Sequence, residues 1–144
     1  MGDYTALRIN LESREQPHQG STSLEVRLEP STSWAGVAWQ DPPQDWGEQP
    51  GGYDLSGAKR LSFWARGRFG GEKVSFGVGL LGSDVLYPDS DTAILKNVKL
   101  TDKWKRYQIK LKGKDLSRLK TPFWWSMTGS RGSQVFYLDD IAFE

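Results

Sequence analysis

The sequence predicts an all-β domain, a two-sheet antiparallel β-sandwich of the jelly-roll type. Along most of the chain, apolar and polar residues alternate with a period of two, which is typical of strands with one solvent-exposed face. Turn-forming segments rich in Gly, Pro, Asp and Ser separate these runs. The 144 residues fit one domain with its own core, and neither a linker nor a repeat divides them. An up-and-down barrel is the alternative, but the unequal turn lengths favour the sandwich.

About nine strands are expected in chain order. The clearest are the runs SLEVRLE, RLSFWAR, KVSFGVGLL and KRYQIKLK, which begin at Ser23, Arg60, Lys73 and Lys105. The run WAGVAWQ at 34–40 is a fifth strand, and four weaker runs begin at Ala6, Ala93, Phe123 and Gln134. Only residues 115–120 could form a short helical turn.

Composition excludes several functions. The formal net charge is +1 without a charge block, so bulk charge does not favour a nucleic-acid partner. No apolar run approaches the roughly 20 residues that cross a membrane, and the start MGDYTALRIN does not read as a signal peptide. Cysteine is absent, which excludes disulfides and thiolate-ligated zinc. We therefore expect neither a nucleic-acid nor a membrane partner.

Several blocks in order suggest a family. The segments PGGYDLSGAKRLSFWARG, DKWKRYQIKLKGKDLSR and FYLDDIAFE follow GSTSLEV and WAGVAWQDPPQDWG. From residue 20 to 144 the chain thereby resembles jelly-roll carbohydrate-binding modules of the galactose-binding-like type. These modules are appended to secreted bacterial glycoside hydrolases and other cell-surface proteins. The resemblance implies an extracellular or cell-surface location and attachment to a larger enzyme or surface protein.

The same resemblance assigns the strands to two sheets. It places 34–40, 74–81, 94–100 and 121–128 in a concave sheet. It places 23–28, 61–66, 104–111 and 135–143 in the other sheet. A polysaccharide would then bind on the concave surface.

Alternation sorts the tryptophans of the concave sheet. If Val37 points inward, Trp39 does so too, and Trp34 faces the concave surface. In PFWWSM, the polar Ser126 indicates that Trp124 shares its outer face while Trp125 enters the core. Because pyranose rings stack their C–H face on flat aromatic rings, Trp34 and Trp124 are predicted to form a sugar platform.

Small and polar residues complete the predicted site. Glycines and alanines at positions 36, 38, 77 and 79 are expected to leave an open trough beside the platform. Gln40, Ser75 and Ser126 would supply hydrogen bonds to the sugar rim, and Trp46 would wall one end of the trough. Alternatively, Trp46 only pins its own loop against Tyr53. The remaining two tryptophans are expected to be structural, with Trp104 at a strand start and Trp64 under a loop.

The last strand contains two consecutive acids, Asp139 and Asp140. A strand normally excludes such a pair unless a bulge or a cation accounts for it. The resemblance implies a structural calcium, with Asp139 as the acidic ligand and the turn from Gly20 to Ser23 as the source of carbonyl oxygens. The alternative is that both acids are solvated at a strand edge.

Catalysis is not expected. His18 is the only histidine and lies in the probable loop QPHQG, so a Ser-His-Asp triad would depend on it. A carboxylate pair for glycoside hydrolysis could come from Asp84, Asp89 or Asp91, but their segment is typical of an exposed loop. The sequence therefore predicts a non-catalytic carbohydrate-binding module for a neutral polysaccharide such as a β-glucan or a related plant or microbial glycan. A protein-interaction or structural β-sandwich of a bacterial surface protein is the alternative.

Overall fold

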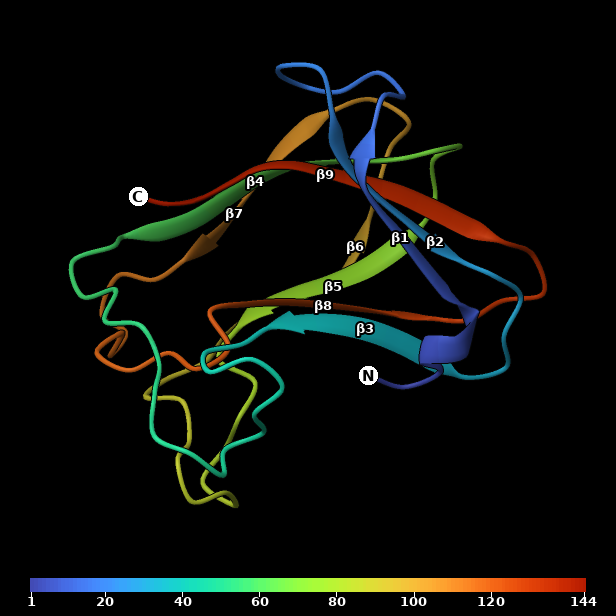
Figure 1. Ribbon diagram of the computed structural model, residues 1–144. Coiled ribbons are helices and arrows are strands. Elements are labelled where there is room, and N and C mark those ends of the chain that lie inside the picture. Colours follow the sequence, from blue (N-terminus) through green and yellow to red (C-terminus); the bar gives the residue numbers. More distant parts are fainter.

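Nine strands form two antiparallel sheets that face each other, as the computed structural model of residues 1–144 shows (Figure 1). A three-residue 3-10 turn at Tyr4–Ala6 precedes them, and no helix is long and apolar enough to cross a membrane. The strands are β1 (Leu7–Ser13), β2 (Ser23–Leu28), β3 (Trp34–Trp39), β4 (Arg60–Gly67), β5 (Lys73–Val78), β6 (Ala93–Lys99), β7 (Lys105–Lys110), β8 (Phe123–Thr128) and β9 (Gln134–Phe143).

The strand order confirms the predicted division into sheets. One sheet has the order β3-β8-β5-β6, and the other has the order β1-β2-β9-β4-β7, in which the weakly patterned β1 is an edge strand. The all-β sandwich is confirmed. The helical turn expected at 115–120 is wrong, because this segment is irregular and Leu119 pairs with Tyr53 in an isolated bridge.

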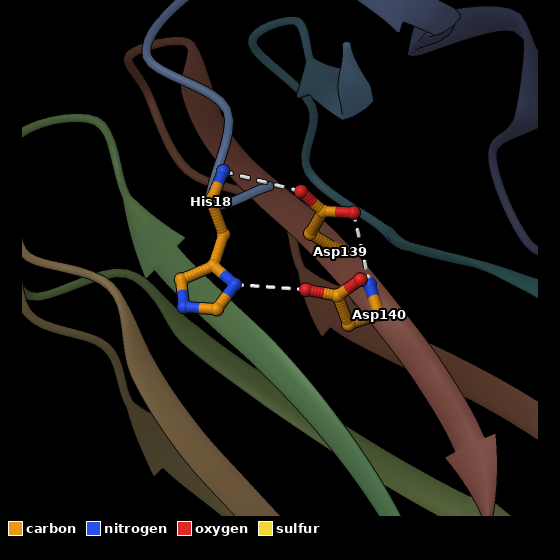
Figure 2. A group of neighbouring side chains, drawn as sticks. All are labelled: His18, Asp139 and Asp140. Atoms are coloured by element: carbon orange, nitrogen blue, oxygen red, sulfur yellow. Dashed lines mark hydrogen bonds and ion pairs between the residues drawn. The ribbon is translucent and has the colours of Figure 1, made fainter. Parts of the chain in front are cut away.

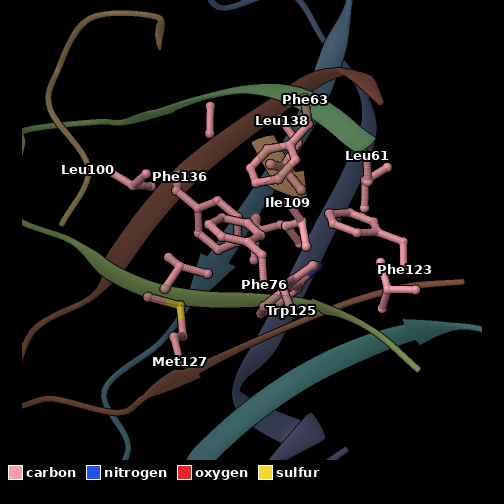
Figure 3. Packing of buried hydrophobic residues seen from close by; sticks show 14 of the residues in the cluster. Leu61, Phe63, Phe76, Leu100, Ile109, Phe123, Trp125, Met127, Phe136 and Leu138 are labelled. Atoms are coloured by element: carbon pink, nitrogen blue, oxygen red, sulfur yellow. The ribbon is translucent and has the colours of Figure 1, made fainter. Parts of the chain in front are cut away.

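The core fills the space between the sheets with the inward residues of both. Phe63 of β4 contacts Phe76 of β5 with ring centroids 4.5 Å apart, and Trp125 of β8 meets Phe136 of β9 edge to face at 5.0 Å (Figure 3). Nineteen buried hydrophobic residues form one cluster. Burial of each large side chain stabilises the fold by about 1.5–3 kcal/mol, which fixes the faces of all the strands.

The N-terminal segment lies along the free edge of β3. The Asp3 N–H donates to the Trp34 carbonyl at 2.7 Å, and the Gly36 N–H donates to the Met1 carbonyl at 3.2 Å. A Cβ at Gly36 would be 3.1 Å from the Met1 methyl carbon, so the Met1 side chain lies over this glycine. The segment thus satisfies backbone groups that an edge strand leaves unpaired.

Candidate functional site

The outer face of the four-stranded sheet consists of three cross-strand rows. Register pairs Trp34 with Thr128 in the first row and Gly36 with Ser126 in the second, where Ser126 also pairs with Ser75. The third row runs through Ala38, Trp124, Gly77 and Ile94. The first and third rows lie four positions apart along the strand, from Trp34 to Ala38, which corresponds to about 13 Å.

A groove of about 490 Å³ lies over the first two rows. Its aromatic wall is Trp34, which is 47% exposed. Lys73 is the only charged residue of the lining. The lining residues, mostly small or uncharged and polar, are Trp34, Gly71, Lys73, Ser75, Asn97, Ser126, Met127, Thr128, Gly129, Ser130 and Gln134. Hydroxyl and amide groups beside a flat indole are the chemistry that binds a neutral sugar.

Irregular backbone directs several of these polar groups. The pairing of β5 with β6 shifts register after Val74, and Asn97 has a positive φ of 51°. The Asn97 backbone N–H donates to the Ser75 Oγ at 3.0 Å, and the Ser75 hydroxyl lies 3.5 Å from the Asn97 Oδ1, so the two residues lie together at the groove. Gln134 donates from Nε2 to the Thr128 carbonyl at 2.9 Å. Sequence reasoning missed Asn97 and Gln134, because strict alternation from the outward Ile94 puts Lys96, not Asn97, on the outer face of this strand.

The predicted site residues separate into two groups. Trp34, Ser75 and Ser126 line the groove together. Gln40 does not: it donates from Nε2 to the Asp45 carbonyl at 2.8 Å and lines a different cavity, so its predicted position on the trough is wrong. Trp46 is 43% exposed on the loop after β3 and lies outside the groove lining.

Trp124 occupies the predicted face but not the predicted environment. It is only 7% exposed, its Nε1 is buried without a hydrogen-bond partner, and a Cβ at Gly77 would overlap its ring. The expected exposed platform at Trp124 is therefore wrong, because the indole lies flat on the glycine. The open trough is wrong for the same reason: Trp124 covers Gly77 and Met1 covers Gly36.

The two tryptophans predicted to be core differ. Trp125 is fully buried, which confirms the prediction. Trp39 contacts Phe123 at 5.1 Å on the inner side but is 38% exposed, so its assignment to the core is wrong. The physical reason is its place as the last residue of an edge strand, where no further strand covers its second face.

Two loops beyond the Trp39 end of the sheet are held together by buried charge (Figure 1). Lys120, 1% exposed, pairs with Asp45, and its ammonium also donates to the Gln49 carbonyl. The Lys120 hydrogen bond, with backbone N–H groups, keeps the pKa of Asp45 below its ordinary value. The Tyr87 N–H donates to the Gly47 carbonyl at 2.9 Å, which connects a third loop, between β5 and β6, to the loop after β3.

Asp89 and Asp91, two of the three acids of the loop between β5 and β6, organise this region by accepting hydrogen bonds. Asp89 accepts hydrogen bonds from the N–H groups of Leu81, Lys120 and Thr121 and from the Thr121 hydroxyl. Backbone N–H groups at positions 115 and 92 bond the Asp91 carboxylate and hold its pKa below the ordinary value. Neither residue lines the groove.

The acidic pair of the last strand lies in a β-bulge. Pairing of β9 with β4 shifts register between Asp139 and Ala142, and Asp140 has φ of 51°. Figure 2 shows the Asp139 carboxylate accepting the His18 N–H at 3.1 Å, while its other oxygen accepts the Asp140 N–H at 2.9 Å. The His18 Nδ1 lies 2.8 Å from an Asp140 carboxylate oxygen.

The predicted calcium ligands fit this geometry only in part. Ligand atoms of His18, Asp139 and Asp140 all lie within 4.8 Å of one another, and the buried Ser23 Oγ has no hydrogen-bond partner. Two carboxylates and a hydroxyl suit calcium. However, the N–H groups of His18 and Gln19, not carbonyl oxygens, point at Asp139. The bulge and these hydrogen bonds account for the acidic pair in the protein alone.

The loop that carries His18 also covers two tryptophans. His18 stacks on Trp64 with centroids 3.8 Å apart and an interplanar angle of 18°. Trp104 donates from Nε1 to the Gln16 carbonyl at 2.6 Å. The loop thus covers Trp64 on the outer face of the five-stranded sheet, as predicted.

No protein-family model matches the sequence, and no curated protein matches it. Solved structures do match. A family 30 carbohydrate-binding module of a Clostridium thermocellum cellulosomal cellulase superposes with a TM-score of 0.66 at 19% identity, over 94% of this chain and 84% of that chain. The chain has the fold of these modules.

Two further modules have the same architecture. A family 11 carbohydrate-binding module of another Clostridium thermocellum cellulosomal cellulase matches with a TM-score of 0.59 at 14% identity, over 94% of this chain and 78% of that chain. A xylan-binding domain from Paenibacillus barcinonensis matches with a TM-score of 0.54 at 16% identity, again over 94% and 78%. At these identities the likeness establishes the jelly-roll β-sandwich.

Proposed function

We propose that the protein is a non-catalytic carbohydrate-binding module that binds a neutral polysaccharide in the Trp34 groove. The observation that carries the proposal is the exposed Trp34 ring beside a floor of hydroxyl and amide groups. An indole face stacks on the C–H face of a pyranose, and the short polar side chains bond the hydroxyl rim. Lys73 is the only charged residue of the lining, which suits an uncharged ligand because such a ligand needs no oppositely charged partner.

The chemistry of the groove supports binding over hydrolysis. Most glycoside hydrolases use two carboxyl groups that flank the bond to be cleaved. The groove lining contains none, and Asp89 and Asp91 are engaged by loop backbone elsewhere. The module would act by raising the local concentration of an attached secreted enzyme, or of a cell surface, at its substrate.

The ligand class is a β-glucan or a related plant or microbial glycan. The similar structures support this class, since one is a xylan-binding domain and another was solved with β-1,4-galactotriose. The groove lining extends across the four strands, from Trp34 on β3 to Asn97 on β6, which suits several units of a glycan chain better than a single sugar. It also suits a ligand made of repeated neutral pyranose units.

The test is affinity electrophoresis in gels that contain a soluble β-glucan, a xylan, a galactan or a mannan. We expect one of them to retard the protein, and Trp34→Ala to weaken that binding about ten- to hundredfold, by analogy with base stacking. Trp39→Ala is the matched control, an exposed tryptophan of the same strand on the opposite face. No retardation by any glycan, or equal binding by the Trp34→Ala variant, refutes the site and favours the protein-interaction alternative.

We also propose that calcium stabilises the fold through Asp139, with Ser23 and Gly20 as neighbouring donors. Binding to the folded state alone raises stability by mass action. Removal of calcium with a chelator should lower the melting temperature, and added calcium should restore it. Asp139→Asn keeps the hydrogen-bond acceptor for the His18 N–H and should abolish the restoration. If chelation changes nothing after extended dialysis, the hydrogen bonds of the bulge suffice without a cation.

A further inference from the structure

A second polar pocket of about 480 Å³ lies on the outer face of the five-stranded sheet, at the loop that follows β1. It is lined by Arg14, Glu15, Gln16, Arg66, Arg68 and Phe69. Three arginines against one glutamate leave two positive charges in a chain whose formal net charge is only +1. The positive charge is therefore concentrated in this pocket, which the composition of the whole chain does not reveal.

Arg66 is the buried centre of the pocket. It is 6% exposed, and its guanidinium lies 4.0 Å from the Tyr137 ring centroid and 5.4 Å from that of Trp104. Nη2 donates to the Glu15 carbonyl at 2.9 Å, whereas the buried Nε has no partner. A buried cation is costly unless it is paired and hydrogen-bonded. An anion in the pocket would supply the missing pairing.

The single carboxylate of the pocket is already committed. Glu15 accepts the Tyr137 hydroxyl at 2.8 Å and Arg68 Nη2 at 3.2 Å. The Tyr137 hydrogen bond and then the Arg68 charge lower the pKa of Glu15, while burial and then the Glu15 hydrogen bond raise the pKa of Tyr137 to about 12. Glu15 therefore stays ionised and forms its ion pair with Arg68, while the charge of Arg66 also helps to lower its pKa. Neither Arg14 nor Arg66 forms an ion pair with Glu15, the one carboxylate of the lining.

An exposed aromatic ring stands at the rim. Phe69 is 80% exposed, so its ring makes almost no packing contribution to the fold. Its loop is nevertheless well held, because the Phe69 N–H donates to the Glu72 carboxylate at 3.1 Å and the Arg68 N–H donates to the Val135 carbonyl at 3.0 Å. A held, solvent-facing ring beside arginines offers a stacking face next to positive charge.

We propose that this pocket is a second binding site, for a sugar unit that bears a carboxylate or a sulfate group. The anion would pair with Arg14 and Arg66, and the sugar face would stack on Phe69. Since Phe69 and the groove residue Gly71 belong to the same loop, the two sites flank this loop on different sheets. The protein would then recognise acidic as well as neutral units of a heteropolysaccharide.

The experiment is isothermal titration calorimetry at low and at physiological salt concentration. The four probes are polygalacturonate for carboxylate, dextran sulfate for sulfate, dextran as the neutral control and a single-stranded oligonucleotide for phosphate. We expect one of the acidic polysaccharides to bind, and more weakly as salt increases. Phe69→Ala and Arg14→Gln should each weaken it about tenfold, by analogy with other stacking and charged contacts. Both side chains are exposed, so folding should be unaffected.

Lys112→Gln is the matched control, because it removes one positive charge from an exposed turn away from the pocket. This variant should bind the acidic polysaccharide with an affinity within about twofold of that of the parent protein, since a distant charge is screened by salt and contributes little. Three results would overturn the proposal: no binding of either acidic polysaccharide, an equal loss in the Lys112→Gln variant, or oligonucleotide binding as tight as that of the best acidic polysaccharide. Trp34→Ala should retain acidic binding, so that failure here and failure of the neutral-glycan groove are told apart.

Discussion

Two neighbouring strands of one sheet, β3 and β8, each carry two tryptophans on opposite faces, but the exposed fractions of these tryptophans differ between the two strands. On β3, Trp34 and Trp39 are 47% and 38% exposed. On β8, Trp124 and Trp125 are 7% and 0% exposed. Alternation predicts the face of each ring correctly, but the exposure follows the position of the strand. A ring on an interior strand is buried on either face, whereas a ring on an edge strand remains available to a ligand.

The physical reason is the number and size of the flanking residues. β8 has β3 on one side and β5 on the other, and the flanking Gly77 leaves room for the Trp124 ring to lie flat. β3 has a strand partner on one side only, and on the other side the Met1–Asp3 segment contacts it. This segment covers Gly36 and one part of the Trp34 indole, since a Cβ at Gly2 would lie 3.0 Å from the Trp34 Cδ2, but 47% of Trp34 remains exposed at the groove.

The largest expected effect in this comparison is that of Trp125→Ala. The side chain is fully buried against Phe136, so its removal leaves a cavity and should lower the free energy of unfolding by about 3–5 kcal/mol. Urea denaturation followed by fluorescence of the remaining tryptophans measures the loss. A change below about 1 kcal/mol would mean that the core does not depend on this ring.

The next largest effect is expected of Trp124→Ala, which should lower the free energy of unfolding by about 3 kcal/mol although the ring lies on the outer face. The same ring can be displaced without deleting it: Gly77→Ala places a Cβ into the indole and should destabilise the fold by about 1–3 kcal/mol through overpacking.

Gly132→Ala is the matched control, because nothing lies within 4 Å of a Cβ there. It should change the denaturation midpoint very little. If Gly77→Ala is equally harmless, the Trp124 ring is not packed on the glycine, and the interior strand offers it to a ligand after all.

The smallest effects on stability are expected on the edge strand. Trp39→Ala should lower the free energy of unfolding by about 1 kcal/mol or less, since the substitution removes a contact with Phe123 but the ring is already partly exposed to water. Trp34→Ala should cost no more than that while reducing glycan affinity. Thermal denaturation of both variants, beside the binding assay, separates the two rings. A large loss of stability in either variant would contradict the distinction between edge and interior.

Much of the fold could be predicted from the sequence because period-two alternation is a local property. The nine strands follow from it, and the resemblance carried by the order of the sequence blocks placed eight of them, all but β1, in the correct sheets. Part of the groove followed as well, because Ser75 and Ser126 lie on outer positions of predicted strands. Asn97 was missed because a register shift and a positive φ place it beside Ser75, and alternation carries no sign of either.

Outside the bulges at Asn97 and Asp140, the sequence by itself determined which face of a strand a side chain takes, since a period of two leaves only one arrangement that buries the apolar set. Only the tertiary structure decided how much of each ring remains exposed, as Trp39 and Trp124 show. It also decided the two sites that combine distant segments: the His18–Asp139 contact at 3.1 Å joins residues 121 positions apart, and the Arg66 pocket joins β4 to the loop after β1. Exposure and long-range proximity depend on what packs from elsewhere in the chain, and no local pattern encodes that.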